Sequence, residues 1–376
     1  MTQPIAFIDL AAQRRRIAGE IDAAIARVLD HGGFINGPDV TEFEKRLAAF
    51  CGAKFAVGCG NGTDAIQLVL MAKGIGAGDA VIVPDYTFTA TAEAVALVGA
   101  TPVFVDVQAA DFNIDVAGVE AGLRVARDRG LKPRAVISVD LFGLPADYDA
   151  LNAFCDANGL LLIADAAQSF GATYRGRKAG ALAPVTTTSF FPAKPLGCYG
   201  DGGAILTDDA GLVATLKSLR VHGQGADKYD NVRIGVNSRL DTIQAAILMC
   251  KLDIFADEIE KRQLVAARYT EALGNRVITP TVPDDCVSVW AQYTIRIPGG
   301  KRDEVAAKLK AAGVPTAIYY PKPLHRQTAY KHFPASGALE ASDRLSQEAL
   351  SLPMHPYLAA DTQATIVNAL VASLEI

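Results

Sequence analysis

The sequence lacks three features that would place it in familiar classes: closely spaced cysteines, long uncharged apolar runs and an excess of basic residues. Its six cysteines stand far apart, at positions 51, 59, 155, 198, 250 and 286, so there is no C-x-x-C pair and no metal site is expected. We interpret them as reduced thiols, most of which fill the core. Because no run of about 20 apolar residues is free of charge, we expect no membrane span.

The charge balance excludes a further group of partners. The formal net charge is -5 over 376 residues, whereas proteins that bind nucleic acids or anionic membranes usually present a basic surface. The first ten residues contain no basic segment followed by an apolar core, so we expect no signal peptide and a cytoplasmic location. The composition, 50% apolar and 20% charged, is typical of a soluble globular protein.

Short β runs and helical patterns alternate through the first two thirds of the chain. Helical spacing predicts helices at 41–51, 63–73, 114–127 and 147–158, and Thr41 with Glu44 forms a capping-box pair. Apolar β runs lie at 81–83, 103–105, 136–139 and 160–163, and further β runs lie at 186–191 and 204–207. Continuous apolar strands separated by helices predict a parallel sheet that is covered on both faces.

A change of pattern near residue 240 predicts a second domain. Strong helical spacing over 240–272 is followed by a proline-rich connection at 279–285. Beyond it we expect a strand over 287–297, a helix over 302–312, a short strand over 315–319 and a C-terminal helix over 361–373. We therefore predict a large α/β domain over 1–250 and a smaller α+β domain over 251–376.

The segment around Lys194 carries the most informative chemistry. It reads Ser189-Phe190-Phe191-Pro192-Ala193-Lys194-Pro195-Leu196-Gly197 and places one lysine between two apolar runs. Burial among apolar groups lowers the pKa of a lysine and allows its amine to act as a nucleophile. Such a lysine can form an imine with a carbonyl, including the aldehyde of pyridoxal phosphate (PLP). Taken alone, it could equally be a surface lysine before a strand.

A glycine-rich turn, Gly58-Cys59-Gly60-Asn61-Gly62-Thr63, comes directly before a predicted helix. Glycines let the backbone approach a ligand closely, and a helix N-terminus presents free N–H groups, so this turn could bind a phosphate. An ordinary strand-to-helix turn is the alternative. The turn is neither a P-loop nor a G-x-G-x-x-G motif, which argues against a nicotinamide oxidoreductase.

Three more candidates follow predicted strands. Asp165 and Gln168 lie in Ala164-Asp165-Ala166-Ala167-Gln168, beyond the run at 160–163, where the ligands of open α/β sheets bind. A carboxylate there could keep the pyridine nitrogen of PLP protonated, or it could simply cap a helix. Phe88 follows the run at 81–83 and could stack on a planar cofactor or pack in the core.

Two polar clusters could contact an anionic ligand. Asn237 and Arg239 precede the long predicted helix, where they could bind an anion or cap the helix. A second cluster lies in a proline-rich loop and could hold a nucleotide or an acidic sugar, or could be solvated; it contains Tyr319, Tyr320, Lys322, His325 and Arg326.

Together, and in this order, these segments resemble the DegT/StrS-type nucleotide-sugar aminotransferases, PLP enzymes of fold type I. The resemblance runs from Phe34-Ile35-Asn36-Gly37-Pro38 to Ser351-Leu352-Pro353-Met354-His355-Pro356. It implies an α/β fold, the PLP-dependent transferase fold type I, with a large, mostly parallel sheet sandwiched by helices and a smaller C-terminal α+β domain. It also implies a homodimer whose active sites are shared across the interface.

The resemblance implies two catalytic residues. Lys194 matches the lysine that holds PLP as an imine, and Asp165 matches the acid that pairs with the pyridine nitrogen. Related dehydratases carry histidine where this chain has Lys194, which favours transamination.

The other cofactor contacts are implied in the same way. Gln168 matches a glutamine near the ring oxygen, and Phe88 matches the aromatic residue that stacks on the ring. The groups that match phosphate contacts are Gly62, Thr63, Ser189 and Asn237, the last reaching the phosphate from the neighbouring subunit.

The implied reaction is transfer of an amino group from L-glutamate to C3 of a nucleotide-linked 3-oxo sugar. The segment Leu196-Gly197-Cys198-Tyr199-Gly200-Asp201-Gly202-Gly203 is similar to the C3-aminating members. Together with residues 235–240, it favours UDP-2-acetamido-2-deoxy-3-oxo-D-glucuronate as substrate, for bacterial surface polysaccharide such as the O-antigen of lipopolysaccharide. The candidate substrate contacts are Arg239, Tyr319, Tyr320, Lys322, His325 and Arg326. The alternatives are C3 amination of a dTDP-3-oxo-6-deoxyhexose and a non-catalytic PLP-binding regulator.

Overall fold

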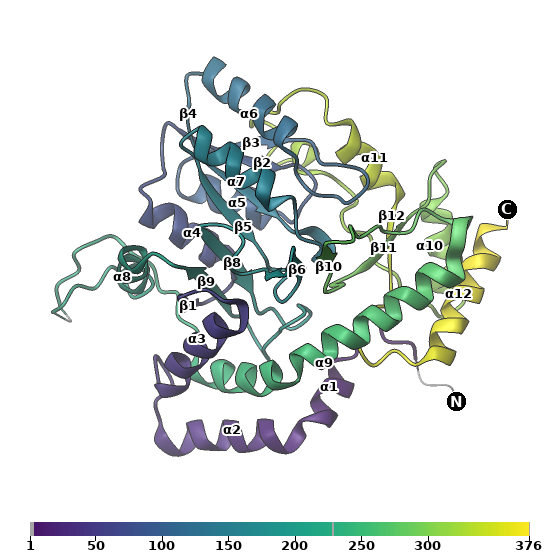
Figure 1. Ribbon diagram of the computed structural model, residues 1–376, viewed down its shortest axis with the longest axis horizontal. Helices are drawn as coiled ribbons and strands as arrows, with labels where there is room; N and C mark the ends of the chain where they lie inside the picture. Colours follow the sequence, from purple (N-terminus) through teal and green to yellow (C-terminus); the bar gives the residue numbers. More distant parts are fainter. Residues whose placement is uncertain (1–3, 228, 376) are drawn as a thin grey trace.

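The computed structural model describes residues 4–227 and 229–375, and this part of the chain contains a central seven-stranded sheet of order β1-β9-β8-β5-β4-β2-β3 (Figure 1). The strands are β1 (Phe55–Cys59), β2 (Asp79–Pro84), β3 (Thr101–Val105), β4 (Lys132–Val139), β5 (Leu161–Asp165), β8 (Val185–Ser189) and β9 (Gly203–Thr207). Both neighbours of β9 pair with it antiparallel, and the remaining pairs are parallel. The predicted, mostly parallel sheet is confirmed.

Helices cover both faces of this sheet. One face carries α4 (Gly62–Ala72), α5 (Ala90–Leu97) and α8 (Ala210–Leu219), and the other carries α3 (Pro38–Cys51), α6 (Val116–Asp128) and α7 (Tyr148–Ala157). Successive side chains of a strand point to opposite faces. Val81 and Val83 therefore pack with the first group of helices, whereas Ala80 and Ile82 pack with the second. Burial on both faces explains why the strands read as continuous apolar runs.

The long helix α9 (Thr242–Leu273) connects two cores (Figure 1). Leu248 and Phe255 in its first part pack with α3 under the central sheet, whereas Val265 and Tyr269 belong to a second core. The short helix α1 (Leu10–Arg16) precedes α2 (Ala18–His31), which packs along α9. The predicted domain boundary at 250/251 therefore falls inside a continuous helix and stays a prediction.

The second core is smaller and mixed. Strand β11 (Tyr293–Arg296) pairs antiparallel with β12 (Ala349–Leu352). Helix α12 (Ala360–Leu374) packs against α9, and α10 (Arg302–Ala311) packs against α12. The predicted strand over 315–319 is wrong, because only Ala317 forms an isolated bridge, to Ser351. The predicted strand over 287–297 is divided, because β10 (Cys286–Val287) pairs instead with β6 (Thr173–Tyr174), whose other neighbour is β7 (Arg177–Lys178).

Part of the C-terminal third returns to the large domain. The 3₁₀ turn η3 (Leu324–Arg326) and α11 (Glu340–Glu348) place Leu324 and Leu345 in the core that also contains β2 and β3. This return brings the proline-rich loop with Tyr319 and Tyr320 to the edge of the central sheet. None of the helices in the described ranges has the length and apolarity that a membrane crossing requires.

Candidate active site

A cavity of about 980 Å³ lies at the edge of the sheet where β1, β2, β5 and β8 end. Asp165 is the last residue of β5, Ser189 is the last residue of β8, and Gly62 begins α4 just after β1. The cavity is lined by all the predicted cofactor residues except Asn237, and also by Tyr319 and Tyr320. The sheet therefore brings together segments that are far apart in the sequence: Gly62 and Tyr320 are separated by 258 positions.

Asp165 and Lys194 interact electrostatically within this cavity. Asp165 is buried, and its Oδ1 accepts a hydrogen bond from Ala167 N at 3.0 Å. Burial raises the pKa of Asp165, and the Ala167 bond and Lys194 oppose that rise. Burial lowers the pKa of Lys194, and Asp165 opposes that change. A lowered pKa favours the neutral amine that nucleophilic and proton-transfer roles require.

A tight loop between β8 and β9 carries Lys194. Its backbone N–H donates to Phe191 O at 2.8 Å, and Cys198 N donates to Phe190 O at 2.8 Å. Position 197 has no room for a side chain, because a Cβ there would lie 2.5 Å from Pro192 O. The glycine thus allows the loop to close tightly around the lysine.

The first turn of α4 and Ser189 form a cradle that fits a phosphate. Asn61 caps the helix by accepting from Asp64 N at 2.8 Å, and the N–H groups of Gly62 and Thr63 have no partner within the helix. A Cβ on Gly62 would lie 2.8 Å from the Cβ of Ser189, so the glycine and the serine are in close contact. Free N–H groups and the positive end of the helix dipole favour an anion at this position.

Tyr319 and Tyr320 also line the cavity, and hydrogen bonds hold both residues in place. Tyr86 donates through its hydroxyl to Tyr319 O at 2.6 Å and accepts from Tyr320 N at 2.9 Å. Gln168 accepts from Phe142 N at 2.7 Å and donates to the Tyr320 hydroxyl at 3.4 Å.

Phe88 lines the same cavity from the segment that follows β2. The side chain is 54% exposed, and its ring centroid lies 6.3 Å from that of Tyr320. The alternative that Phe88 packs in the core is therefore wrong. An exposed ring at a cavity wall offers a face to a planar ligand.

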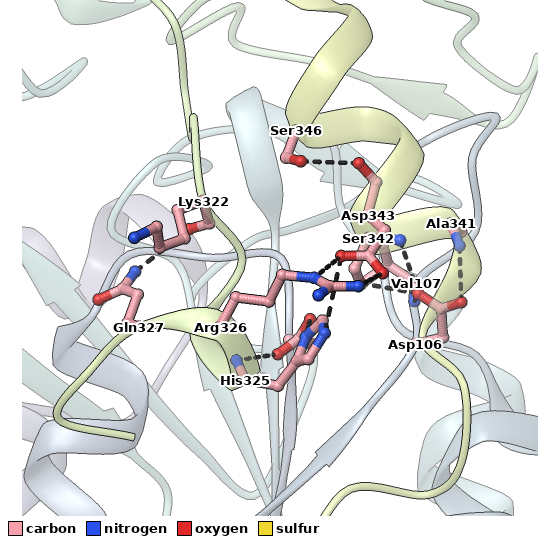
Figure 2. Close-up of polar contacts among 11 residues, drawn as sticks. Asp106, Val107, Lys322, His325, Arg326, Gln327, Ala341, Ser342, Asp343 and Ser346 are labelled. Atoms are coloured by element: carbon pink, nitrogen blue, oxygen red, sulfur yellow. Dashed lines mark hydrogen bonds and ion pairs between the residues drawn. The ribbon is translucent and has the colours of Figure 1, made fainter. Parts of the chain in front are cut away.

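The three predicted substrate residues of the proline-rich loop that do not line the cavity are Lys322, His325 and Arg326. His325 Nδ1 lies 2.6 Å from Asp85 Oδ2, and Arg326 forms a two-pronged ion pair with Asp343 of α11. Figure 2 shows the side chains of both residues directed toward Asp343 and away from Lys322. The local cluster of basic residues predicted an anion site, but carboxylates of this chain already bind two of its members.

Asn237 and Arg239 also lie outside the cavity lining of the single chain. Asn237 is exposed, and Arg239 is half-buried. Between them, Ser238 Oγ accepts a hydrogen bond from Gly60 N at 2.9 Å, so this segment lies directly beside the glycine-rich turn.

Sequence reasoning missed several polar residues that line the cavity: Asn61, Asp64, Glu93, Asp201, Gln292 and Gln327. Asn61 could have been recognised as an N-cap, because asparagine commonly occupies the position before a helix. Gln292 and Gln327 follow no local motif, and only the return of the C-terminal third brings them to the site. Across the described ranges, no group of three or more His, Cys, Asp and Glu residues is placed to hold a metal ion.

The fold and this cavity define a PLP-dependent transferase of fold type I. The chain belongs to the DegT/DnrJ/EryC1/StrS aminotransferase family, whose model matches residues 15–371. It is 51% identical over 355 residues to UDP-2-acetamido-2-deoxy-3-oxo-D-glucuronate aminotransferase of Pseudomonas aeruginosa. The matched region covers 94% of this chain and 96% of that protein.

Solved structures show the same relationship. A DegT/DnrJ/EryC1/StrS aminotransferase from Brucella abortus superposes with a TM-score of 0.96 and 51% identity, over 99% of this chain and 100% of that chain. NtdA from Bacillus subtilis, solved with bound cofactor PMP, has a TM-score of 0.90 and 27% identity, over 100% of this chain and 86% of that chain.

Proposed function

We propose that this chain transfers an amino group from L-glutamate to C3 of UDP-2-acetamido-2-deoxy-3-oxo-D-glucuronate, as a step toward bacterial surface polysaccharide such as the O-antigen of lipopolysaccharide. The observation that carries the choice of substrate is the 51% identity, across 94% of the chain, to a P. aeruginosa enzyme of that name. We also propose a cytoplasmic location, since all six cysteines are free thiols.

The residues at the cavity fit PLP. When bound, PLP supplies an aldehyde carbon that can carry an amino group and a ring that stabilises negative charge. The N–H groups of Gly62 and Thr63, together with Ser189, would hold its phosphate. Asp165 would pair with the pyridine nitrogen, and Phe88 would stack on the ring. This set places an anion site, a buried acid and an aromatic face around one cavity.

Lys194 has two tasks in this proposal. Its Nζ would bind the cofactor covalently and, when free, would take a proton from the reacting carbon and return it. The lowered pKa of Lys194 suits both tasks, because each needs a neutral amine. Burial of Lys194 causes this lowering and the charge of Asp165 opposes it, so the neutral amine depends on burial, while Asp165 would serve the ring nitrogen.

The proposed substrate carries a carboxylate and a diphosphate, but Lys194 is the only lysine, arginine or histidine among the described residues that line the cavity. The segment with Asn237 and Arg239 lies beside Gly60, and Asp241, two residues beyond Arg239, forms a β-bridge with Ile35. Phe34 and Ile35 are 46% and 49% exposed, as expected for an apolar surface that a second subunit covers.

We therefore propose a homodimer in which Asn237 and Arg239 of one subunit complete the cavity of the other. Tyr319 and Tyr320 are the substrate contacts that we propose within the same chain. His325 and Arg326 are not included, because their polar groups bind Asp85 and Asp343. A role for Lys322 stays a prediction.

The first experiment is the visible absorbance spectrum of the purified protein with PLP, before and after addition of L-glutamate. We expect a band from the lysine-bound cofactor that disappears with glutamate and returns when the 3-oxo uronate sugar is added. Return of the band only with a dTDP-3-oxo-6-deoxyhexose would replace the proposed substrate. A band that no donor removes would point to a PLP-binding regulator, and absence of any band would contradict the proposed cofactor residues.

Mixing two inactive variants tests the shared site. The first variant is Lys194→Ala, and the second carries both Asn237→Ala and Arg239→Ala. Each variant alone should be inactive, and a dimer with one subunit of each should regain part of the activity. Regain is expected because one of its two cavities would then contain only native residues. No regain after verified subunit exchange would overturn the shared-site arrangement.

A further inference from the structure

Lys251 is a lysine in the interior of the protein without a carboxylate partner among the described residues. It lies on α9 and is 1% exposed. Its Nζ donates to Gly197 O at 2.6 Å and lies 4.0 Å from the centroid of the Tyr199 ring. Burial of an ammonium group with so few polar partners is energetically costly, and burial lowers the pKa of Lys251 to about 8. A methionine would fill the same space without that cost, so the ammonium must contribute something specific.

The backbone that Lys251 contacts belongs to the loop of Lys194. Gly197 is three residues beyond Lys194, and it has no room for a side chain. Seven residues before Lys251, on the same face of α9, Gln244 holds the adjoining part of that loop. Its Oε1 accepts from Tyr199 N at 2.8 Å, and its Nε2 donates to Tyr199 O at 3.3 Å. Two side chains of one helix thus bind three backbone groups of the loop.

We propose that Lys251 is a positioning residue that fixes the loop of Lys194 against α9 and thereby sets the place of the Lys194 amine in the cavity. The inference rests on the role proposed above for Lys194. The first part of α9 is held rigidly in the core by Leu248, Leu252 and Phe255. A loop that is hydrogen-bonded to such a helix keeps Lys194 in one position. Without these hydrogen bonds, the Lys194 amine would move away from the reacting carbon more often.

The experiment compares Lys251→Met with Lys261→Met in the cofactor-free protein. Lys261 is a partly exposed lysine of the same helix that pairs with Asp257 at 2.9 Å, so its variant controls for loss of a charge from α9. Hydrogen exchange, read by mass spectrometry, should become about tenfold faster over residues 190–202 in Lys251→Met, the effect of losing one hydrogen bond to a charged group. Lys261→Met should leave that segment unchanged. Unchanged exchange over 190–202 in Lys251→Met would overturn the proposal.

Kinetics of the half-reaction with glutamate give the second readout. In Lys251→Met, kcat should fall about tenfold while KM stays within about twofold, because Lys251 positions the amine of Lys194 and does not bind the substrate. A tenfold loss in kcat/KM that came only from a raised KM would contradict a positioning role. If Lys251→Met does not fold, Gln244→Ala replaces it in the test, because this substitution loosens the same loop without removing a buried charge. The same changes in hydrogen exchange and kinetics are expected for Gln244→Ala.

The exchange measurement needs neither PLP nor substrate, so it separates the two proposals. If Lys194→Ala retained full activity, the assigned role of Lys194 would fail while the exchange result would still report on the loop. Faster exchange throughout the large domain of Lys251→Met, and not over 190–202 in particular, would show a general structural role and would also overturn the proposal.

Discussion

Asp85 Oδ2 lies 2.6 Å from His325 Nδ1, and Asp85 Oδ1 accepts a second hydrogen bond from His325 N at 2.7 Å. Asp85 is fully buried just after β2, and His325 stands in η3, 240 positions further along the chain. The next residue after Asp85 is Tyr86, whose hydroxyl fixes Tyr319 and Tyr320. The Asp85–His325 pair therefore anchors the loop that carries Tyr319 and Tyr320 at the cavity.

We expect His325→Gln to destabilise the protein more in mildly acidic than in alkaline solution. The pKa of His325 is raised, first by its hydrogen bond with Asp85 and also by the charges of Asp85 and Asp343, while burial and Arg326 oppose the rise. A raised pKa means that this stabilisation is complete below the unfolded value of about 6.5 and is lost as pH rises through the folded value. The loss in free energy of unfolding, about 2 kcal/mol near pH 6, should shrink toward pH 9 in urea titrations.

Arg326→Gln is the matched control for that experiment. Arg326 also binds Asp343, but its side chain is exposed, so its removal should have the smaller effect. Because arginine keeps its charge over this range, the effect should not vary with pH as that of His325→Gln does. If the difference between wild type and His325→Gln were the same at both pH values, the charge of His325 would have no part in the anchor.

Lys194→Ala should lower the rate of transamination about a thousandfold or more and leave the fold intact. The variant loses the amine that binds the cofactor and moves the proton. Steady-state assays with glutamate and the sugar measure the rate, and far-ultraviolet circular dichroism checks the fold. Full activity would remove Lys194 from the reaction.

Asp165→Asn separates the charge of this side chain from its shape. The amide fills the same buried volume but cannot balance a protonated ring nitrogen, so we expect PLP to bind more weakly and the rate to fall about a hundredfold. Asp165→Ala should be at least as severe. Spectrophotometric PLP titration and the half-reaction with glutamate measure the two effects; a wild-type rate in both variants would rule out the proposed pairing.

The sheet could be predicted from sequence because its strands are apolar on both faces. The run at 160–163 lies within one residue of the start of β5, and the run at 204–207 falls inside β9. The helix α5 escaped prediction because its alanine-rich sequence is buried on several sides and shows no amphipathic stripe. The strand expected over 315–319 failed because strand-like residues there meet β12 only at Ala317.

The site residues that lie close to the end of a strand could be predicted from the sequence. Asp165 and Phe88 each follow a recognisable apolar run, and Ser189 lies within the β run at 186–191. Parallel strands bring such positions to one edge of a sheet. Pairings between distant segments leave no local pattern. The basic character of His325 was visible in the sequence, but its partner Asp85 was not, so the residue was assigned to substrate instead of to a buried carboxylate.

Gly62→Ala tests the phosphate cradle directly. The added methyl group would lie 2.8 Å from the Cβ of Ser189, so one of the two segments must shift. Such overpacking typically costs about 1–3 kcal/mol, and we expect PLP affinity to fall about tenfold or more. Gly19→Ala is the control, because a Cβ there would meet no atom within 4 Å on the exposed start of α2. It should leave PLP affinity unchanged and raise the free energy of unfolding by about 0.5–1 kcal/mol. If Gly62→Ala bound PLP as tightly as wild type in a fluorescence titration, the phosphate would have to bind elsewhere.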